Sequence, residues 1–459
     1  MIREKFWWKK YLEEDKNIIR PVDGYEYFLT FNYLGVTDIF PKFETEDFYI
    51  CAQNNLPQIE IFNYQFKYIE QYPFWYRKKF ELIKNINFIE INNLGETDYR
   101  KYLEKENICQ GINDNFDPND KSIKLSFRIE ICQINENQTM LSLKAFHATS
   151  DGRTIFNIFD YVRKIVEFII ENKNNKELIK TKIFLEKKEA KICPFGQYEN
   201  YINLDKKLYE KPPEKWFEVP LKRILPDLEM DEKTDKGKIH YISQYHIFDY
   251  KKVNEFCKKY RVSVQAMLAT MLSRATRKYF NLSENFPIYN YTPCDSRPSK
   301  LATEYLKNRE FFCGAGALFP KSIGQGDLIK DIQYNYTSLK ECIPKLENII
   351  QIMRSSMAIN DETLEMNQDT KMPTFSSHSC TCSSNIGKVK GNLPCFNICM
   401  DLNKETAKKD YILCFYSVHT DKYLVILDLK PNFLNKKFYD IIIDEMNLIF
   451  NYEKMISTI

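Results

Sequence analysis

In the run from Lys121 to Ile131 (KSIKLSFRIEI), five apolar residues from Ile123 on alternate with polar neighbours. Side chains of a strand point in turn to its two faces, so this run predicts a strand with one buried face. Met140–His147 predicts a second strand, joined to the first by a turn at Asn135–Gln138. Ile155–Ile170 has apolar residues at helical spacing and predicts an amphipathic helix. This order of elements favours a mixed α/β fold.

The length of 459 residues accommodates two domains. A polar stretch with several prolines follows the predicted helix and is typical of a connection rather than a domain. We therefore expect an N-terminal lobe over 1–175, a polar crossover linker over 176–238 and a C-terminal lobe over 239–459.

The spacing of apolar residues and the positions of helix-breaking prolines predict further helices and strands. In the first lobe, Asn63–Tyr72 has apolar residues at loose helical spacing and predicts a helix that Pro73 ends. The second lobe is expected to contain a strand, a helix pair with a break at its centre, four more strands and a closing helix: His240–Phe248, Val253–Tyr279 with the break at Val262–Val264, Ile288–Tyr291, Phe311–Phe319, Ile412–Val418, Tyr423–Leu429 and Tyr439–Phe450.

Charge and composition exclude several classes of function. Lys and Arg number 66 against 63 Asp and Glu, interleaved along the chain, so nucleic acid is not an expected partner. Only 13 residues are glycine, and no glycine-rich phosphate-binding motif is present. The sequence has no apolar run long enough to cross a membrane, and its charged N-terminus does not resemble a signal peptide. The 13 scattered cysteines indicate reduced thiols, so we expect a cytoplasmic protein.

One short motif carries chemistry. His147 ends the second strand, and Asp151 and Gly152 follow it before the helix. An imidazole there is suited to accept a proton from a hydroxyl or an amine near neutral pH. The alternative is structural: His147 only ends the strand and Asp151 caps the helix. Asp151 is expected to be the N-cap in either case.

The arrangement of strand, HxxxDG motif and helix over Ala145–Phe159 (AFHATSDGRTIFNIF) resembles the acyltransferase superfamily that includes chloramphenicol acetyltransferase-like enzymes, alcohol O-acetyltransferases, plant BAHD acyltransferases and peptide-synthetase condensation domains. Six further segments are similar to that fold in order and spacing: its opening segment, its first helix with the turn after it, the strand before the motif, the long helix of the second lobe, a strand ending in an arginine, and a Ser-Asn element facing the histidine. They are Arg20–Tyr33, Phe66–Arg77, Phe116–Ile129, Ser263–Thr276, Ile288–Pro298 and Ser383–Gly387.

Departures from the family patterns select among its branches. The DFGWG signature of BAHD enzymes is absent, and Phe146 stands where condensation-type motifs have a first histidine. Alcohol acetyltransferase-like members are similar in having a single histidine, so that branch is the nearest.

The resemblance implies a chloramphenicol acetyltransferase-like fold of two lobes, each a mixed sheet with flanking helices, and an active-site tunnel between them. It implies an acyltransferase that moves an acyl group from acyl-CoA, a co-substrate rather than a cofactor, to a small alcohol or amine. His147 would be the general base, and Ser383 or Ser384, beside Asn385, would donate to the oxyanion. Asp151 would form a structural ion pair with Arg297 next to Gly152. A monomer is expected.

A zinc site is the competing interpretation of a second cluster. His378, Cys380, Cys382, Cys395 and Cys399 lie within 22 positions, but their spacing does not match the paired CxxC knuckles of structural zinc sites. On a strand, Cys380 and Cys382 would share one face as two buried thiols. We therefore predict no metal.

Two other function classes remain open. A condensation-type enzyme would take its acyl group from a carrier-protein thioester, and a relative without turnover would be a binding module. A serine hydrolase lacks support because no GxSxG motif is present. His240, His246 and His419 occupy strand-like contexts and are not expected to be catalysts.

Overall fold

The computed structural model describes residues 4–30, 32–82, 116–117, 119–190, 225–226, 241–295, 315–345, 362–365, 381–400 and 413–455. The described residues before 191 contain seven strands: β1 Ile18–Pro21, β2 Asn32–Pro41, β3 Tyr64–Ile69, β4 Tyr72–Arg77, β5 Ile123–Lys124, β6 Phe127–Gln133 and β7 Gln138–Phe146. The described helices of this part are α1 Lys9–Glu14, α2 Gly24–Leu29, α3 Thr45–Asn55, α5 Gly152–Glu171 and α6 Lys176–Thr181, with short 3₁₀ turns at Leu56–Gln58 and Glu60–Asn63.

The described residues after 240 contain the remaining elements. Their strands are β8 Tyr241–Asp249, β9 Ile288–Tyr289, β10 Thr292–Asp295, β11 Ala315–Leu318, β12 Lys321–Ser322, β13 Thr381–Lys388, β14 Cys395–Met400, β15 Leu413–His419 and β16 Tyr423–Pro431. Their helices are α8 Tyr250–Tyr260, α9 Val264–Tyr279, α11 Leu328–Cys342 and α14 Lys436–Asn451, and a 3₁₀ turn follows α11 at Ile343–Lys345.

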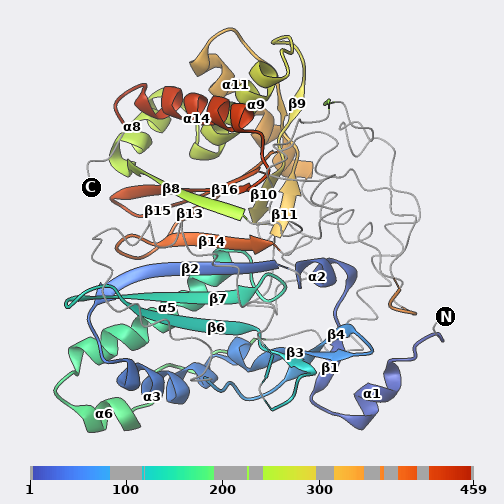
Figure 1. The fold of residues 1–459 in the computed structure, drawn as a ribbon, viewed down its shortest axis with the longest axis vertical. Coiled ribbons are helices and arrows are strands. Elements are labelled where there is room, and N and C mark those ends of the chain that lie inside the picture. Colours follow the sequence, from blue (N-terminus) through green and yellow to red (C-terminus); the bar gives the residue numbers. More distant parts are fainter. Residues whose placement is uncertain are drawn as a thin grey trace.

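Of the three four-stranded sheets among the described residues, two form the centres of two lobes (Figure 1). The first lobe has the strand order β14-β2-β7-β6, and a smaller sheet, β1-β4-β3-β5, lies beside it. The second lobe has the order β13-β15-β16-β8, in which β13 and β15 run parallel and the other neighbours antiparallel. Helices α8, α9, α11 and α14 cover the outer face of this second sheet in Figure 1. The molecule is thus an α/β protein of two lobes.

The strand β14 joins the lobes because it belongs to the sheet of the first lobe although it comes late in the chain. Cys395–Met400 pairs antiparallel with Asn32–Thr37 of β2. In Figure 1 β14 lies between β2 and the second sheet. A strand from the second half of the chain therefore completes the sheet that contains β2, β7 and β6.

Apolar side chains fill the space on both sides of β14. One continuous core extends from Phe159 of α5 through Phe396 of β14 to Tyr416 and Leu427 on the inner face of the second sheet. Since one core serves both lobes, burial of apolar surface holds them together. A second core, which includes the fully buried Phe415, lies between the other face of the second sheet and its helices.

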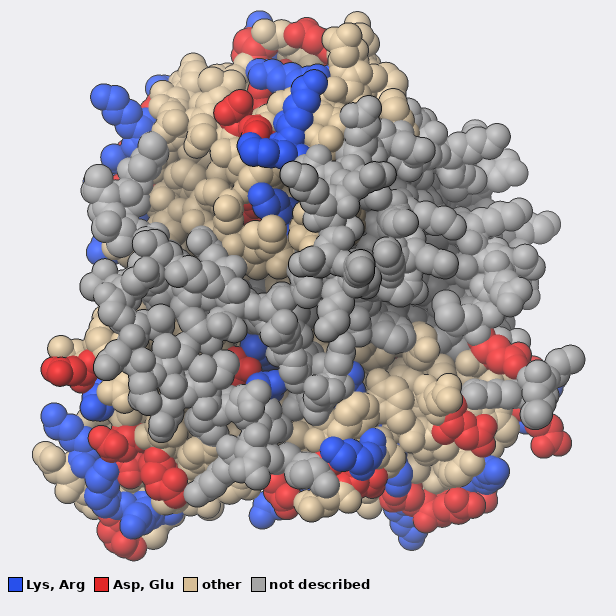
Figure 2. Space-filling view, in the orientation of Figure 1, with Lys and Arg blue, Asp and Glu red and all other residues tan. Residues whose placement is uncertain are grey.

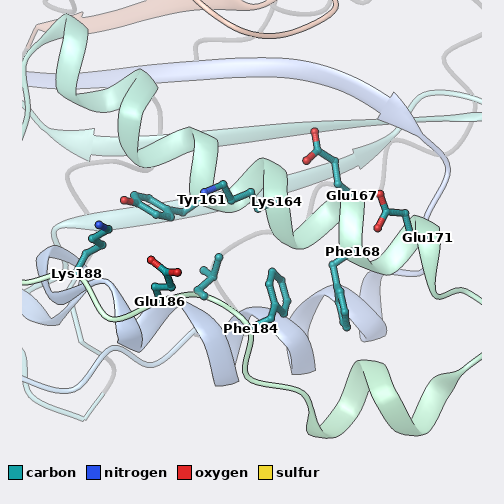
Figure 3. A pocket seen from close by; sticks show the side chains of 9 residues that line it. Tyr161, Lys164, Glu167, Phe168, Glu171, Phe184, Glu186 and Lys188 are labelled. Carbon is teal, nitrogen blue, oxygen red and sulfur yellow. The ribbon is translucent and has the colours of Figure 1, made fainter.

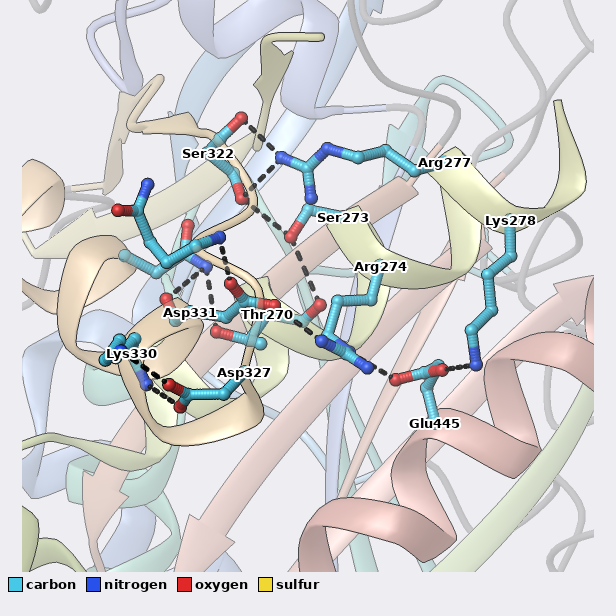
Figure 4. A network of polar contacts seen from close by, with 12 residues as sticks. Thr270, Ser273, Arg274, Arg277, Lys278, Ser322, Asp327, Lys330, Asp331 and Glu445 are labelled. Carbon is cyan, nitrogen blue, oxygen red and sulfur yellow. Dashed lines mark hydrogen bonds and ion pairs between the residues drawn. The ribbon is translucent and has the colours of Figure 1, made fainter. Parts of the chain in front are cut away.

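A network of charged and hydroxyl groups fixes α9 to its neighbours (Figure 4). Arg274 of α9 contacts Glu445 of α14 at 2.7 Å and Asp331 of α11 at 2.6 Å. One turn on, Lys278 pairs with the same Glu445, which is 1% exposed. Arg277 donates to the carbonyl of Ser322 at 2.6 Å. These contacts make α9 a rigid support for what lies at its N-terminus.

Most elements predicted from the sequence are confirmed. β7 and α5 cover the predicted strand and helix of the motif, and α8 and α9 are separated at the predicted break, where Arg261 has φ +54°. The described strands β8, β9, β11, β15 and β16 and the helix α14 fall on the other predicted elements of the second lobe. The run Lys121–Ile131 is extended but divided, because β5 pairs with β3 of the smaller sheet and β6 pairs with β7.

The predicted helix over Asn63–Tyr72 is wrong, and so is the resemblance of Phe66–Arg77 to a helix and turn. The segment forms the hairpin of β3 and β4, with Ile69 opposite Tyr72. Glu70 and Gln71 form its two-residue turn with φ of +49° and +68°. Two-residue turns with positive φ usually contain Asn or Gly, and neither residue occupies this turn. The aromatic residues of both strands favour the pleated surface over a helix.

Basic and acidic residues lie next to one another along the lower edge of the face in Figure 2. Among the described helices none combines the length and the apolar composition of a membrane span.

Candidate functional site

The imidazole of His147 is held by the loop between β7 and α5. Phe146, the last residue of β7, pairs with Tyr33 of β2, and the N–H of His147 donates to Asn32 O at 2.8 Å. The loop then turns tightly, with Ser150 N donating to His147 O at 3.3 Å. His147 Nδ1 lies 3.0 Å from the carbonyl oxygen of Ser150.

This contact determines how the ring can act. A carbonyl oxygen can only accept, so Nδ1 carries the proton and Nε2 of the neutral ring carries the lone pair. Burial lowers the pKa of His147 below its ordinary value of 6.5, against the opposing influence of its backbone hydrogen bonds and of Asp151. The ring is therefore neutral, and a proton acceptor, at neutral pH.

Asp151 is the N-cap of α5, as the sequence predicts. Its Oδ1 accepts from the N–H groups of Arg153 at 3.0 Å and Thr154 at 2.8 Å, and the residue is 4% exposed. Arg297, its predicted ion-pair partner, lies outside the described residues, so that pair stays a prediction.

Gly152 brings the motif against the second lobe. A Cβ atom at Gly152 would lie 3.0 Å from Cδ1 and Cγ1 of Ile386 in β13. Beside it, Arg153 Nη1 donates to the carbonyl of Lys388 at 2.7 Å. The start of α5 therefore packs directly on the strand that contains the Ser-Ser-Asn-Ile-Gly segment.

That segment is a strand, β13, rather than the polar loop that was its alternative interpretation. Ser383 is fully buried, and its Oγ receives a hydrogen bond from Gln265 Nε2 at 2.8 Å. Ser384, 8% exposed, donates from Oγ to Pro293 O at 3.1 Å. Asn385 Oδ1 accepts from Ser417 Oγ at 3.0 Å. The two serines thus have different surroundings, and their hydroxyls are directed to different neighbours.

Gln265, near the start of α9, makes three hydrogen bonds to this segment and was not singled out by the sequence. Besides its bond to Ser383 Oγ, it accepts from the N–H of Asn385 at 2.9 Å. A glutamine in the segment SVQAMLATM carries no signal of its own, because the strand it binds lies more than a hundred residues further along the chain.

The zinc candidates are divided between elements. Cys382 lies in β13, whereas Cys395 and Cys399 lie in β14; His378 and Cys380 are outside the described residues. Burial raises the pKa of the Cys382 thiol, which interacts with Cys414 on the neighbouring strand β15. In the part of the chain that the structure describes, no three His, Cys, Asp or Glu side chains gather as metal ligands.

Two of the remaining histidines have structural surroundings. His246 Nε2 lies 3.7 Å from the buried carboxylate of Asp428. His419 stacks on Tyr250 with ring centroids 3.9 Å apart. His240 is outside the described residues.

A groove of about 420 Å³ lies between α5 and the segment that follows α6 (Figure 3). Tyr161 and Phe168 of α5 line it together with Phe184 and Lys188 of the segment after α6. Its lining includes none of the residues of the His147 motif, so we do not take it as the active site.

Solved structures of other proteins have a fold similar to that of this chain. No family model matches the sequence, and no curated protein does. Solved structures match over nearly the whole chain. The epimerization domain from the third module of tyrocidine synthetase B has a TM-score of 0.59 at 12% identity, covering 98% of this chain and 97% of its own.

Two other solved structures are similar to the same extent. Polyketide synthase associated protein 5 from Mycobacterium tuberculosis has a TM-score of 0.59 at 10% identity and covers 95% of this chain and 99% of its own. The starter condensation domain of rhizomide synthetase RzmA, solved in complex with C8-CoA, has a TM-score of 0.57 at 9% identity, covering 98% and 93%. The chain therefore has the two-lobed, chloramphenicol acetyltransferase-like α/β fold that condensation domains and CoA-dependent acyltransferases share.

Proposed function

We propose that the protein transfers an acyl group from an acyl-CoA thioester to a hydroxyl or amine acceptor, with His147 as general base. The observation that carries this is the Nδ1 contact of His147 to the Ser150 carbonyl, which leaves the basic lone pair on Nε2. Among proteins of this fold, one is named an acyl transferase and another was solved with C8-CoA, which supports a thioester donor.

In this reaction His147 Nε2 takes the proton of the acceptor as its oxygen or nitrogen bonds to the thioester carbonyl carbon. The carbon–sulfur bond then breaks, and the imidazolium returns the proton to the leaving thiolate. A positioned base of this kind accelerates such a step by roughly 10²–10⁴-fold.

The tetrahedral intermediate requires a donor to its oxyanion. Of the two candidate serines we favour Ser384, because the hydroxyl of Ser383 is fully buried against Gln265. To donate to the oxyanion, the Ser384 hydroxyl would rotate away from Pro293 O. Ser384 lies two residues before Ile386, which packs on Gly152 of the motif. Asn385 and Gly152 would then shape the site, and Asp151 with Arg297 would hold its loop.

The test is to incubate the protein with acetyl-CoA and longer acyl-CoAs against pooled alcohols and amines, following products by mass spectrometry. His147→Ala should abolish product while the protein stays folded. His419→Ala is the matched control, since burial likewise lowers the pKa of His419 and its Nδ1 also lies near a backbone carbonyl, that of Thr420 at 3.3 Å. Equal product from wild type and His147→Ala would contradict the proposal.

A carrier-bound donor is the second candidate, favoured by the condensation domains among the structural neighbours. Absence of product with every acyl-CoA, followed by product with an acylated carrier protein, would select it. No product with either donor would indicate a binding module.

A further inference from the structure

The side chain of Gln265 lies where two neighbouring strands stop pairing. Tyr291, just before β10, and Cys382 of β13 form a parallel bridge in which Ser383 N donates to Tyr291 O at 3.0 Å. In a parallel ladder, the residue two further along would make the next two bonds. Its N–H would donate to Ser383 O, and its carbonyl would accept from Asn385 N.

Pro293 occupies that position. Proline has no N–H, so it cannot donate to Ser383 O, and the ladder ends. The carbonyl of Pro293 accepts the hydroxyl of Ser384 at 3.1 Å instead. Without a substitute, the Ser383 carbonyl and the Asn385 amide would lose their hydrogen bonds inside the protein, which is costly.

The amide of Gln265 supplies both missing bonds. Its Nε2 donates to Ser383 O at 3.1 Å, and its Oε1 accepts from Asn385 N at 2.9 Å. Further contacts of Nε2 reach Ser383 Oγ and Thr292 Oγ1 at 2.8 and 3.3 Å. The residue is 8% exposed. A side-chain amide has the same donor and acceptor as a peptide group, so Gln265 takes the place of the absent strand neighbour.

Helix α9 holds this amide in place. Ser263 caps the helix one residue before its start, accepting from Ala266 N at 3.2 Å. Further along, the network of Arg274, Lys278 and Glu445 anchors the same helix (Figure 4). The position of Asn385 is therefore set from a helix rather than from a strand.

We infer that Gln265 is a positioning residue for the acyl-transfer site: it fixes the backbone on both sides of Ser384, the residue proposed to donate to the oxyanion. This inference rests on the proposed function. Within β13, Ser384 contacts Pro293 of β10 through its hydroxyl, and its two chain neighbours Ser383 and Asn385 are both bound by Gln265.

The experiment compares Gln265→Leu, Gln265→Glu and the matched control Asn55→Leu. Asn55 is a buried amide of the first lobe that also replaces peptide groups, donating to Lys182 O at 3.0 Å and accepting from Phe184 N at 2.8 Å. Product formation from octanoyl-CoA and the best acceptor gives kcat and KM. Hydrogen exchange of peptides covering 381–388 gives the state of β13 independently of activity.

We expect Gln265→Leu to lower kcat by about 100-fold with little change in the KM for the donor, since misplacing a reacting group by about 1 Å costs that much. Exchange in 381–388 should rise, whereas exchange in β16 should not. Gln265→Glu should retain more of kcat than Gln265→Leu, because burial favours its protonated acid, which keeps one donor and one acceptor. Asn55→Leu should lower the melting temperature without lowering kcat.

The inference would be overturned if Gln265→Leu kept the kcat of wild type. It would also be overturned if Gln265→Leu and Asn55→Leu had the same kcat. Unchanged exchange in 381–388 would overturn it as well. If wild type forms no product from any donor, the proposed acyl transfer fails instead, and the exchange result alone decides whether Gln265 positions this strand.

Discussion

At the scale of single residues, the protonation state of His147 decides the chemistry. The contact of Nδ1 with Ser150 O and the burial of the ring both favour the neutral form. Because Asp151 is turned to the backbone N–H groups of α5, it acts on His147 through its charge and not as a direct partner of Nδ1. The motif thus divides its roles: one residue is suited to take the proton and another to hold the loop.

The lowered pKa of His147 predicts the pH dependence. In the unfolded chain the imidazole has a pKa of about 6.5, so the unfolded state binds the proton more readily than the folded state. The stability that His147 contributes is complete above that value and is lost as the pH falls through the folded pKa. We expect the acid limb of the kcat profile to have its midpoint below pH 6.5.

Melting temperatures of wild type and His147→Gln, measured from pH 7.5 to 5, test the same shift without substrate. Wild type should lose stability faster than the variant toward low pH. His419, whose pKa burial also lowers, is present in both proteins and cancels in the comparison. An acid limb centred above pH 6.5 would disprove the assignment of a neutral base with a lowered pKa.

Local patterns revealed part of the site but not all of it. His147, Asp151 and Gly152 were predicted because a strand, a short polar loop and a helix follow one another directly in the sequence. The role of Gln265 depends on a missing N–H at Pro293 and on a strand more than a hundred residues away, which no local pattern contains. The β3–β4 hairpin was missed for a similar reason: Glu70 and Gln71 adopt positive φ without the residues that usually announce it.

At the scale of elements, the packing of α5 on β13 brings the two halves of the proposed site together. The helix starts at Gly152 with Ile386 at van der Waals distance, and Arg153 binds the end of the same strand. The absence of a Cβ at Gly152 allows this approach. Glycine is needed here for space, since its φ is not in the left-handed region.

Gly152→Ala should therefore force Ile386 to shift and destabilise the protein by about 1–3 kcal/mol, as overpacking of a core does. Ile386→Val should relieve part of the loss in the double variant, because the two side chains share one space. Denaturant unfolding of the four proteins of this cycle measures the coupling. Additive free energies of unfolding would show that α5 and β13 do not meet at this point.

At the scale of the whole molecule, a buried ion pair fastens the chain where it crosses from β13 to β14. Arg163 of α5 pairs with the fully buried Asp38 of β2 at 2.9 Å and donates to Lys390 O at 3.1 Å. Asp38 also accepts from the N–H of Leu393 at 3.0 Å. Between them, Gly391 has φ +136°, and any Cβ there would clash with the Asp38 carboxylate.

Arg163→Met should destabilise the protein by about 3–5 kcal/mol, the usual cost of leaving one charge of a buried pair behind. Hydrogen exchange of β14 should increase, since its approach to β2 passes through these contacts. The control is Arg77→Met, which removes an exposed pair with Glu60, 2.8 Å apart, and should cost at most about 1 kcal/mol. If both variants lowered the free energy of unfolding by the same amount, the contacts of Arg163 would not be what holds the segment between β13 and β14.

The late position of β14 in the chain has a consequence for biosynthesis. Until residue 400 has left the ribosome, one edge of β2 lacks its strand partner β14. The unpaired N–H and C=O groups of that edge can then form hydrogen bonds with other chains. The first lobe is translated early but completes its sheet only when most of the protein exists, so its pairing is among the most non-local in the molecule. We therefore expect the first lobe to acquire its complete sheet late, because one edge of β2 stays open until β14 has been made.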